Sequence, residues 1–181
     1  MGFLPAPNET VAVITGEIEA GDADKFIALI DGRPFSQLVL DSKGGDYFES
    51  LYIARHVYMR GVATIAPLRT GCQEGEDATC VCASACVFIW AAGRPRIGSR
   101  LVIHTPILVE GPAELVNNKA RMADHVRHFL GKLEVPQILI DAVIATPFDS
   151  PRPLTEEELQ VLQPFTYDVP DEEHSAAKAP D

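Results

Sequence analysis

Two hydrophobic periodicities alternate along most of this chain, and that alternation limits the fold more than any other feature. Runs rich in apolar and β-branched residues, typical of buried strands, occur at 10–18, 37–42, 62–67 and 100–106. Apolar residues at helical spacing occur at 22–32, 44–61, 84–93, 112–133, 135–146 and 154–163. Strands that alternate with helices predict an α/β fold with a mostly parallel sheet flanked by helices.

The length and charge of the chain narrow its organisation and its partners. Its 181 residues are enough for one domain with a core, which we expect over 1–167, followed by a disordered acidic tail over 168–181. The formal net charge of −11 argues against a nucleic-acid partner, because such a partner requires clustered Lys and Arg. No apolar run approaches the roughly 20 residues of a membrane span, so we predict no transmembrane segment.

All four cysteines, Cys72, Cys80, Cys82 and Cys86, lie within fifteen positions. An even, clustered set favours disulfides and an oxidising compartment, with buried free thiols or a metal site as alternatives. We predict no metal, because the spacing lacks the paired C-x2-C clips of zinc sites. Among the three pairings we expect Cys72 with Cys80, and Cys82 with Cys86, which are one helical turn apart.

Three features that can carry chemistry fall after predicted strands, where the sites of parallel sheets gather. "DSKGG" (41–45) offers backbone amides, Ser84 opens a predicted helix, and His104 ends a strand. A serine hydroxyl becomes a nucleophile when a base removes its proton, and free amides can hold the resulting oxyanion. Taken singly, the three features are also typical of a helix cap, a glycine turn and a hydrogen-bonded strand-end histidine.

Taken together, these segments resemble the ClpP/crotonase superfamily. "LVLDSKGGDYFESLYIARHV", "CASACVFIWAAG" and "SRLVIHTP" are similar to its glycine turn, its serine-bearing helix start and its histidine strand. The resemblance extends over roughly residues 10–165 and is closer to the extracytoplasmic ClpP-like proteins than to ClpP itself. It implies a ClpP/crotonase-like ββα-spiral with a mostly parallel sheet.

The resemblance also implies roles for individual residues. Ser84 matches the nucleophile and His104 the general base, while the amides of Gly45 and Ala85 match the oxyanion hole. Asp149, in a looser local match, corresponds to the third member of the triad.

Other positions depart from the Clp pattern or offer an alternative. Lys119 is an alternative base, as in the related branch that uses a Ser–Lys dyad. Lys43 stands where the family usually has proline.

The function expected from this resemblance is a serine hydrolase that cleaves peptide bonds through an acyl-enzyme, without a cofactor. A catalytically inactive peptide-binding or scaffold protein, and a crotonase-type enzyme acting on acyl thioesters, remain alternatives. The expected partners are a peptide or protein substrate and further copies of this chain. The resemblance implies that a stripe of Leu115, Met122 and Phe129 on the helix 112–133 faces a neighbouring copy; the alternative is that the stripe belongs to the chain's own core.

The expected location is periplasmic or otherwise extracytoplasmic. The opening residues, "MGFLPAPNE", are too short and too weakly charged for a signal peptide. The chain is therefore either cytosolic or a mature form with a new start, and the clustered cysteines favour the second.

Overall fold

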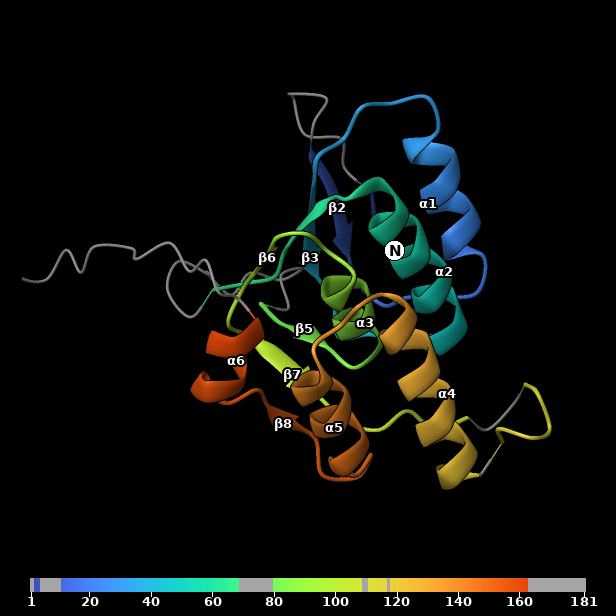
Figure 1. The fold of residues 1–181 in the computed structure, drawn as a ribbon. Coiled ribbons are helices and arrows are strands. Elements are labelled where there is room, and N and C mark those ends of the chain that lie inside the picture. The colour runs from blue at the N-terminus through green and yellow to red at the C-terminus, as the bar shows by residue number, and fades with distance from the viewer. Residues whose placement is uncertain (1, 4–10, 69–79, 109–110, 117, 163–181) are drawn as a thin grey trace, which may run out of the picture.

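The structure is a computed structural model that describes residues 2–3, 11–68, 80–108, 111–116 and 118–162. Five strands form its larger sheet in the order β1-β2-β3-β4-β6 (Figure 1). Strands β2, β3, β4 and β6 are parallel, and β1 is antiparallel to β2. Their bounds are β1 (Gly2–Phe3), β2 (Val11–Thr15), β3 (Gln37–Asp41), β4 (Ala63–Ile65) and β6 (Arg96–Ile97).

A second, three-stranded sheet has the order β5-β7-β8, with β5 (Cys82–Ala83), β7 (Leu101–Ile103) and β8 (Arg152–Pro153). Strands β5 and β7 are parallel, and β8 is antiparallel to β7. The sequence predicted one sheet, and this is a correction. Strand β6 takes the open edge of β4, so β5 pairs with β7 instead, and an isolated bridge between Ser42 and Cys82 joins the sheets.

All six predicted helices are present, as α1 (Asp22–Ile30), α2 (Tyr47–Arg60), α3 (Ala85–Ala91), α4 (Lys119–Lys132), α5 (Gln137–Ala145) and α6 (Glu156–Leu162). Helix α4 begins later than predicted, because the Asn118 side chain accepts from the Arg121 amide and caps it there. The mixed α/β class with a mostly parallel sheet is confirmed. The two-residue strands β1, β5, β6 and β8 were missed, since two residues show no periodicity.

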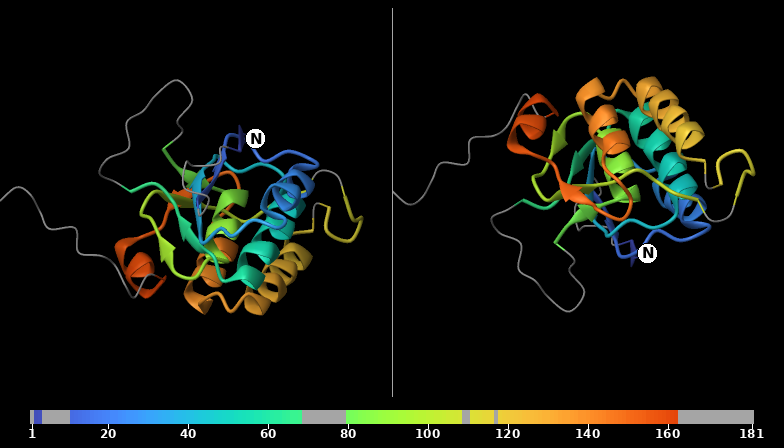
Figure 2. Two further views of the ribbon diagram at one scale, coloured as in Figure 1. Left: turned by 90° about the horizontal axis from the view of Figure 1, so that it is seen from above. Right: turned by 90° about the horizontal axis from the view of Figure 1, so that it is seen from below.

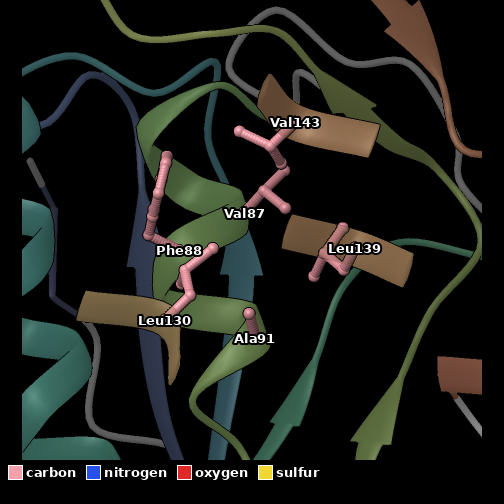
Figure 3. Close-up of a pocket in the computed structure, with 6 residues that line it drawn as sticks. All are labelled: Val87, Phe88, Ala91, Leu130, Leu139 and Val143. Carbon is pink, nitrogen blue, oxygen red and sulfur yellow. The ribbon is translucent and has the colours of Figure 1, made fainter. Parts of the chain in front are cut away.

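Helix α3 is buried along its whole length and lies at the centre of the molecule (Figure 1). Its Val87, Phe88 and Ala91 side chains face Leu130 of α4 and two residues of α5, Leu139 and Val143 (Figure 3). Figures 1 and 2 show α4 and α5 side by side, with α2 next to α4. Tyr47 of α2 also packs against Phe88, so α2, α4 and α5 all contact α3, which starts immediately after Ser84.

The stripe predicted to face a partner, of which Met122 and Phe129 lie in α4 and Leu115 lies before it, packs largely into the chain's own core. Met122 and Leu115 are buried, and Phe129 packs against the same core. This corrects the expectation that these three residues face a neighbouring copy.

The described residues contain no helix that is both long enough and apolar enough to span a membrane. The predicted acidic tail, 168–181, lies outside them.

Candidate functional site

Ser84 is the single residue between β5 and α3, and its main chain has φ 53° and ψ −122°. A non-glycine residue rarely adopts positive φ, and such residues persist where the surroundings enforce the conformation. Its amide donates to the Val102 carbonyl at 2.9 Å, which extends the pairing of β5 with β7. The Ser84 side chain makes no capping bond to α3, so the structure does not support the alternative of an ordinary helix cap.

The glycine turn after β3 packs directly against this serine. A Cβ added to Gly44, at φ +98°, would lie 2.8 Å from Ser84 Cβ and 2.9 Å from the Ala85 nitrogen. A Cβ added to Gly45 would lie 2.1 Å from the Ile18 carbonyl oxygen. Only glycine therefore allows the turn to approach the serine this closely.

Two backbone amides beside Ser84 are available as hydrogen-bond donors. The Ala85 amide belongs to the first turn of α3, where no carbonyl within the helix can accept from it. Within the described part of the chain, neither the Gly45 nor the Ala85 amide has a hydrogen-bond partner. Both residues border the cavity that Ser84 borders, so the two amides are suited to binding an anionic oxygen there.

His104 follows β7, and its Nδ1 lies 3.0 Å from the Thr105 carbonyl oxygen. A carbonyl oxygen only accepts, so Nδ1 carries the proton, and the Nε2 of the neutral ring is left as a base. The ring also packs edge-on against Phe148, with ring centroids 5.0 Å apart. The histidine is therefore oriented by its neighbour's main chain and by one aromatic ring.

One cavity of about 70 Å³ joins most of the predicted site. Gly45, Ser84, Ala85 and His104 all line it, together with Tyr47 and Phe148. These residues come from four segments that are far apart in the sequence. The structure thus brings the predicted nucleophile, base and oxyanion donors to one place. Across the described residues, Ser84 and His104 share no hydrogen bond with each other.

Asp149 and Lys119 do not line this cavity. The Asp149 side chain is exposed, although the preceding residue, Phe148, contacts His104. Lys119 lines a neighbouring cavity of about 90 Å³, whose other lining residues are mostly apolar. The two cavities share Pro106 and Ile107, so they adjoin along the segment that follows His104.

Sequence reasoning missed the contacts that surround these residues. Tyr47, the first residue of α2, hydrogen-bonds through its hydroxyl to His125 Nδ1 of α4, at 3.0 Å. Burial raises the pKa of the Tyr47 phenol, and burial followed by the charge of His128 lowers the pKa of His125. Tyr47 lines the cavity, and His125 supports it from α4. The sequence pattern pointed to neither residue, so only these contacts connect them with the site.

The cysteine prediction holds where the structure describes it. Cys82 and Cys86 lie at disulfide distance, with the sulfurs 2.08 Å apart and the Cα atoms 5.3 Å apart. Cys80 is buried, whereas Cys72 lies outside the described residues. The Cys72–Cys80 pair stays a prediction.

Comparison with known proteins supports the fold. No protein-family model and no curated protein matches this chain. Among solved structures, it is similar to a ClpP1 mutant from Listeria monocytogenes, with a TM-score of 0.57 and 20% identity. The match covers 85% of this chain and 86% of that one. At this identity the likeness shows the fold alone, and we conclude that the chain has a ClpP-like fold.

Proposed function

We propose that this chain is a serine hydrolase of the ClpP-like type that cleaves peptide bonds through an acyl-enzyme. The observation that carries the proposal is the shared cavity, in which Ser84, His104 and the amides of Gly45 and Ala85 meet. The positive-φ turn at Ser84 adds to it, because such strain clusters at functional sites.

In the proposed mechanism, Ser84 Oγ attacks the carbonyl carbon of the scissile peptide bond, and His104 Nε2 takes the hydroxyl proton. The bond between Nδ1 and the Thr105 carbonyl supports this role, since it favours the tautomer whose proton is on Nδ1. The same imidazole then gives the proton to the leaving amine. A water molecule, deprotonated by His104, hydrolyses the resulting ester.

The negative charge of the tetrahedral intermediate would be held by the Gly45 and Ala85 amides. Both amides are fixed by the main chain before substrate arrives, so they need no reorganisation during the reaction. The close packing of Gly44 on Ser84 supports this arrangement, because it sets the distance between the two donors.

Asp149 is the proposed orienting carboxylate for the histidine, and it has to move to fill that role. The Thr105 carbonyl occupies His104 Nδ1, while the Asp149 side chain is exposed. Phe148 lies against the imidazole, so a rotation of the turn at 147–150 would exchange one partner for the other. Peptide binding in the adjoining cavity is the event that we expect to cause it.

The adjoining apolar cavity is the proposed site for a substrate side chain. Leu115, Met122 and Ile107 contribute to its lining, which favours an apolar group of similar size. Lys119 is then a wall residue of this cavity rather than the base.

The proposed compartment is extracytoplasmic, and the cysteine pair at disulfide distance is compatible with it. Counting thiols in protein isolated from its own host under denaturing, non-reducing conditions tests this. Four free cysteines would contradict it.

The proposed assembly is a homo-oligomer, as the resemblance to ClpP implies. Because Leu115 and Met122 are buried and Phe129 packs against the same core, another surface would have to form the contact; Tyr52 and Met59 of α2 are exposed. Light scattering at high concentration checks this, and a particle of about the monomer mass, 19.7 kDa, would contradict it.

An inactive peptide-binding protein is the second candidate. The observation that favours it is the lack of a hydrogen bond between Ser84 and His104 within the described residues. Under this alternative the cavity would bind a peptide without cleaving it.

Labelling with a fluorophosphonate probe, followed by intact-mass analysis, separates the two candidates. The folded, oxidised wild-type chain is expected to gain one adduct, which Ser84→Ala abolishes.

His104→Gln should slow the labelling by about a thousandfold, because the base is lost. Asp149→Asn should leave the labelling rate close to that of the wild type, because the Asp149 side chain is exposed and the probe contains no peptide that would move the turn. A folded wild type that stays unlabelled would contradict the hydrolase and favour the binding protein.

A further inference from the structure

The disulfide and the serine turn occupy the same five residues. Cys82 and Cys86 stand two positions before and two positions after Ser84, and Cys82 belongs to β5 while Cys86 belongs to α3. The cross-link therefore closes a small ring of main chain with Ser84 at its middle. We propose that this disulfide is the positioning device of the catalytic serine, an inference that rests on the proposed function.

The ring contains the proposed nucleophile and one of the two proposed oxyanion donors. Ala83, Ser84 and Ala85 are the only residues between the cysteines, and Ala85 supplies one of the proposed oxyanion donors. Any change of the main chain inside the ring alters the direction of the Ser84 side chain and of the Ala85 amide together. The disulfide thus fixes nucleophile and donor relative to each other.

Ser84 needs such a constraint because of its own conformation. Its φ of 53° is unfavourable for a residue with a Cβ, and its side chain makes no capping bond to α3. The amide bond to Val102 and the packing of Gly44 hold one side of the turn. The cross-link is the covalent restraint that ties the first residue of β5 to the second residue of α3.

Because both cysteines are buried, a positioning role for the disulfide makes a different prediction from a redox switch. Both residues have no exposed surface, so a reductant added to the folded protein does not reach the sulfurs readily. We therefore expect an effect when the cysteines are replaced, and little effect when native protein meets a mild reductant.

The test compares the wild type with the double variant Cys82→Ala/Cys86→Ala in the full chain. Ile30→Ala is the control, since it removes core packing on α1 and lowers stability without touching the serine turn. Fluorophosphonate labelling is measured over a range of probe concentrations, well below the melting temperature of each protein. The maximal labelling rate of the double variant should fall about tenfold to a hundredfold, as a small misplacement of reacting groups produces. Its half-saturating probe concentration should stay close to that of the wild type.

Hydrogen exchange at the Ser84 amide is a second readout that does not depend on activity. This amide is bonded to the Val102 carbonyl, while the Gly16 amide is bonded to Asp41 in the larger sheet. In the double variant, exchange at Ser84 should accelerate more than exchange at Gly16. In Ile30→Ala, the ratio of the two exchange rates should stay at the wild-type value.

The outcomes are distinguishable from a failure of the proposed function. A wild type that stays unlabelled overturns the proposed hydrolase function. The ratio of the exchange rates at Ser84 and Gly16 then still decides whether the disulfide holds the turn. A folded double variant that labels at the wild-type rate, or faster, overturns the positioning role. An unchanged exchange ratio overturns it as well, whatever the labelling shows.

Discussion

The main chain around Ser84 and the segment that carries His104 are held in place by different kinds of contact. Close backbone packing of Gly44, hydrogen bonds to β7 and the cysteine pair surround the serine. The histidine lies at the end of a three-residue strand, with one bond to a neighbouring carbonyl and one half-exposed ring, Phe148, beside it.

The difference indicates which half of the site is built in advance. A side chain at Gly44 or Gly45 would overlap neighbouring backbone atoms, so the packing around the serine turn allows only one conformation. The histidine side depends on a few hydrogen bonds and on the ion pair between Arg152 of β8 and Glu158 of α6, all of which can exchange partners at small cost. We expect substitutions on the serine side to lower stability most, and substitutions on the histidine side to act more gently.

Gly44→Ala should have the largest effect, lowering the free energy of unfolding by about 3 kcal/mol or more. The new Cβ would lie under 3 Å from Ala83, Ser84 and Ala85 atoms. Urea denaturation measures the change. Gly21→Ala is the matched control, since Gly21 has a similar φ of +85° with no atom within 4 Å of the added Cβ. It should cost about 1 kcal/mol, for the positive φ alone. Equal losses for both variants would show that the serine turn is not tightly packed.

Thr105→Val should lower stability by about 1 to 2 kcal/mol, because the Thr105 hydroxyl shares its one proton among carbonyls at the end of α5. The acceptor oxygens of Val143, Ile144 and Thr146 lie within 2.8–2.9 Å. The change should also slow fluorophosphonate labelling, since this contact anchors the residue next to His104. Thr105→Ser keeps the hydroxyl and should restore both properties. Denaturation curves of the three proteins check this, and an unaffected Thr105→Val would contradict the anchoring role.

Glu158→Gln should cost about 1 kcal/mol at neutral pH. The Glu158 carboxylate binds Arg152 of β8 through two bonds, of 2.7 and 2.8 Å, and accepts from the Thr155 amide. Arg152 pairs in turn with Ile103, the residue before His104. The matched control is Glu157→Gln, at an exposed neighbouring position, and it should leave stability nearly unchanged.

This ion pair also predicts a pH dependence with a definite sign. The bond to Arg152 lowers the pKa of Glu158 from its ordinary value of 4.5. Its contribution is therefore complete above pH 4.5 and is lost as the pH falls through the lower pKa of the folded state. The gap between wild type and Glu158→Gln should close over that range, as thermal melts at successive pH values would show. A gap that stays constant would mean that charge plays no part.

Tyr47→Phe should have the smallest effect, about 0.5 to 1 kcal/mol, since one half-buried hydrogen bond to His125 is lost. Because the pKa of His125 is lowered in the fold, the wild type should lose stability as the pH falls below 6.5, the ordinary value. His125→Gln should remove that part of the loss, and His128→Gln, at an exposed position, should remove less. Denaturation at pH 7.5 and pH 5 measures the difference.

Several elements of the fold were predictable because they are local. The strand periodicity of 37–42 and the helical spacing of 44–61 correspond to β3 and α2 within a few residues. The predicted helix at 154–163 corresponds to α6, where Thr155 Oγ1 accepts from the Glu158 amide as a local cap. Such patterns involve residues near one another in the chain, so a single sequence carries them.

The division into two sheets was not predictable, because it depends on which strand takes the edge of β4. The two-residue β6 takes it, and β5 joins β7 across the Ser42–Cys82 bridge. Pairing between distant strands involves backbone groups that every residue has, so the side-chain pattern does not specify it.

The candidate site was likewise predictable only in part. The sequence by itself determined which residues can react, since Ser84, His104 and the glycine pair at 44–45 each come after a predicted strand, and it placed a cysteine on each side of the serine. Only the tertiary structure decided that Gly45, Ser84, Ala85 and His104 border one cavity and that His104 Nδ1 bonds to Thr105 instead of Asp149. The physical reason is that reactivity belongs to a residue's chemistry, whereas distances between segments follow from the packing of the whole core.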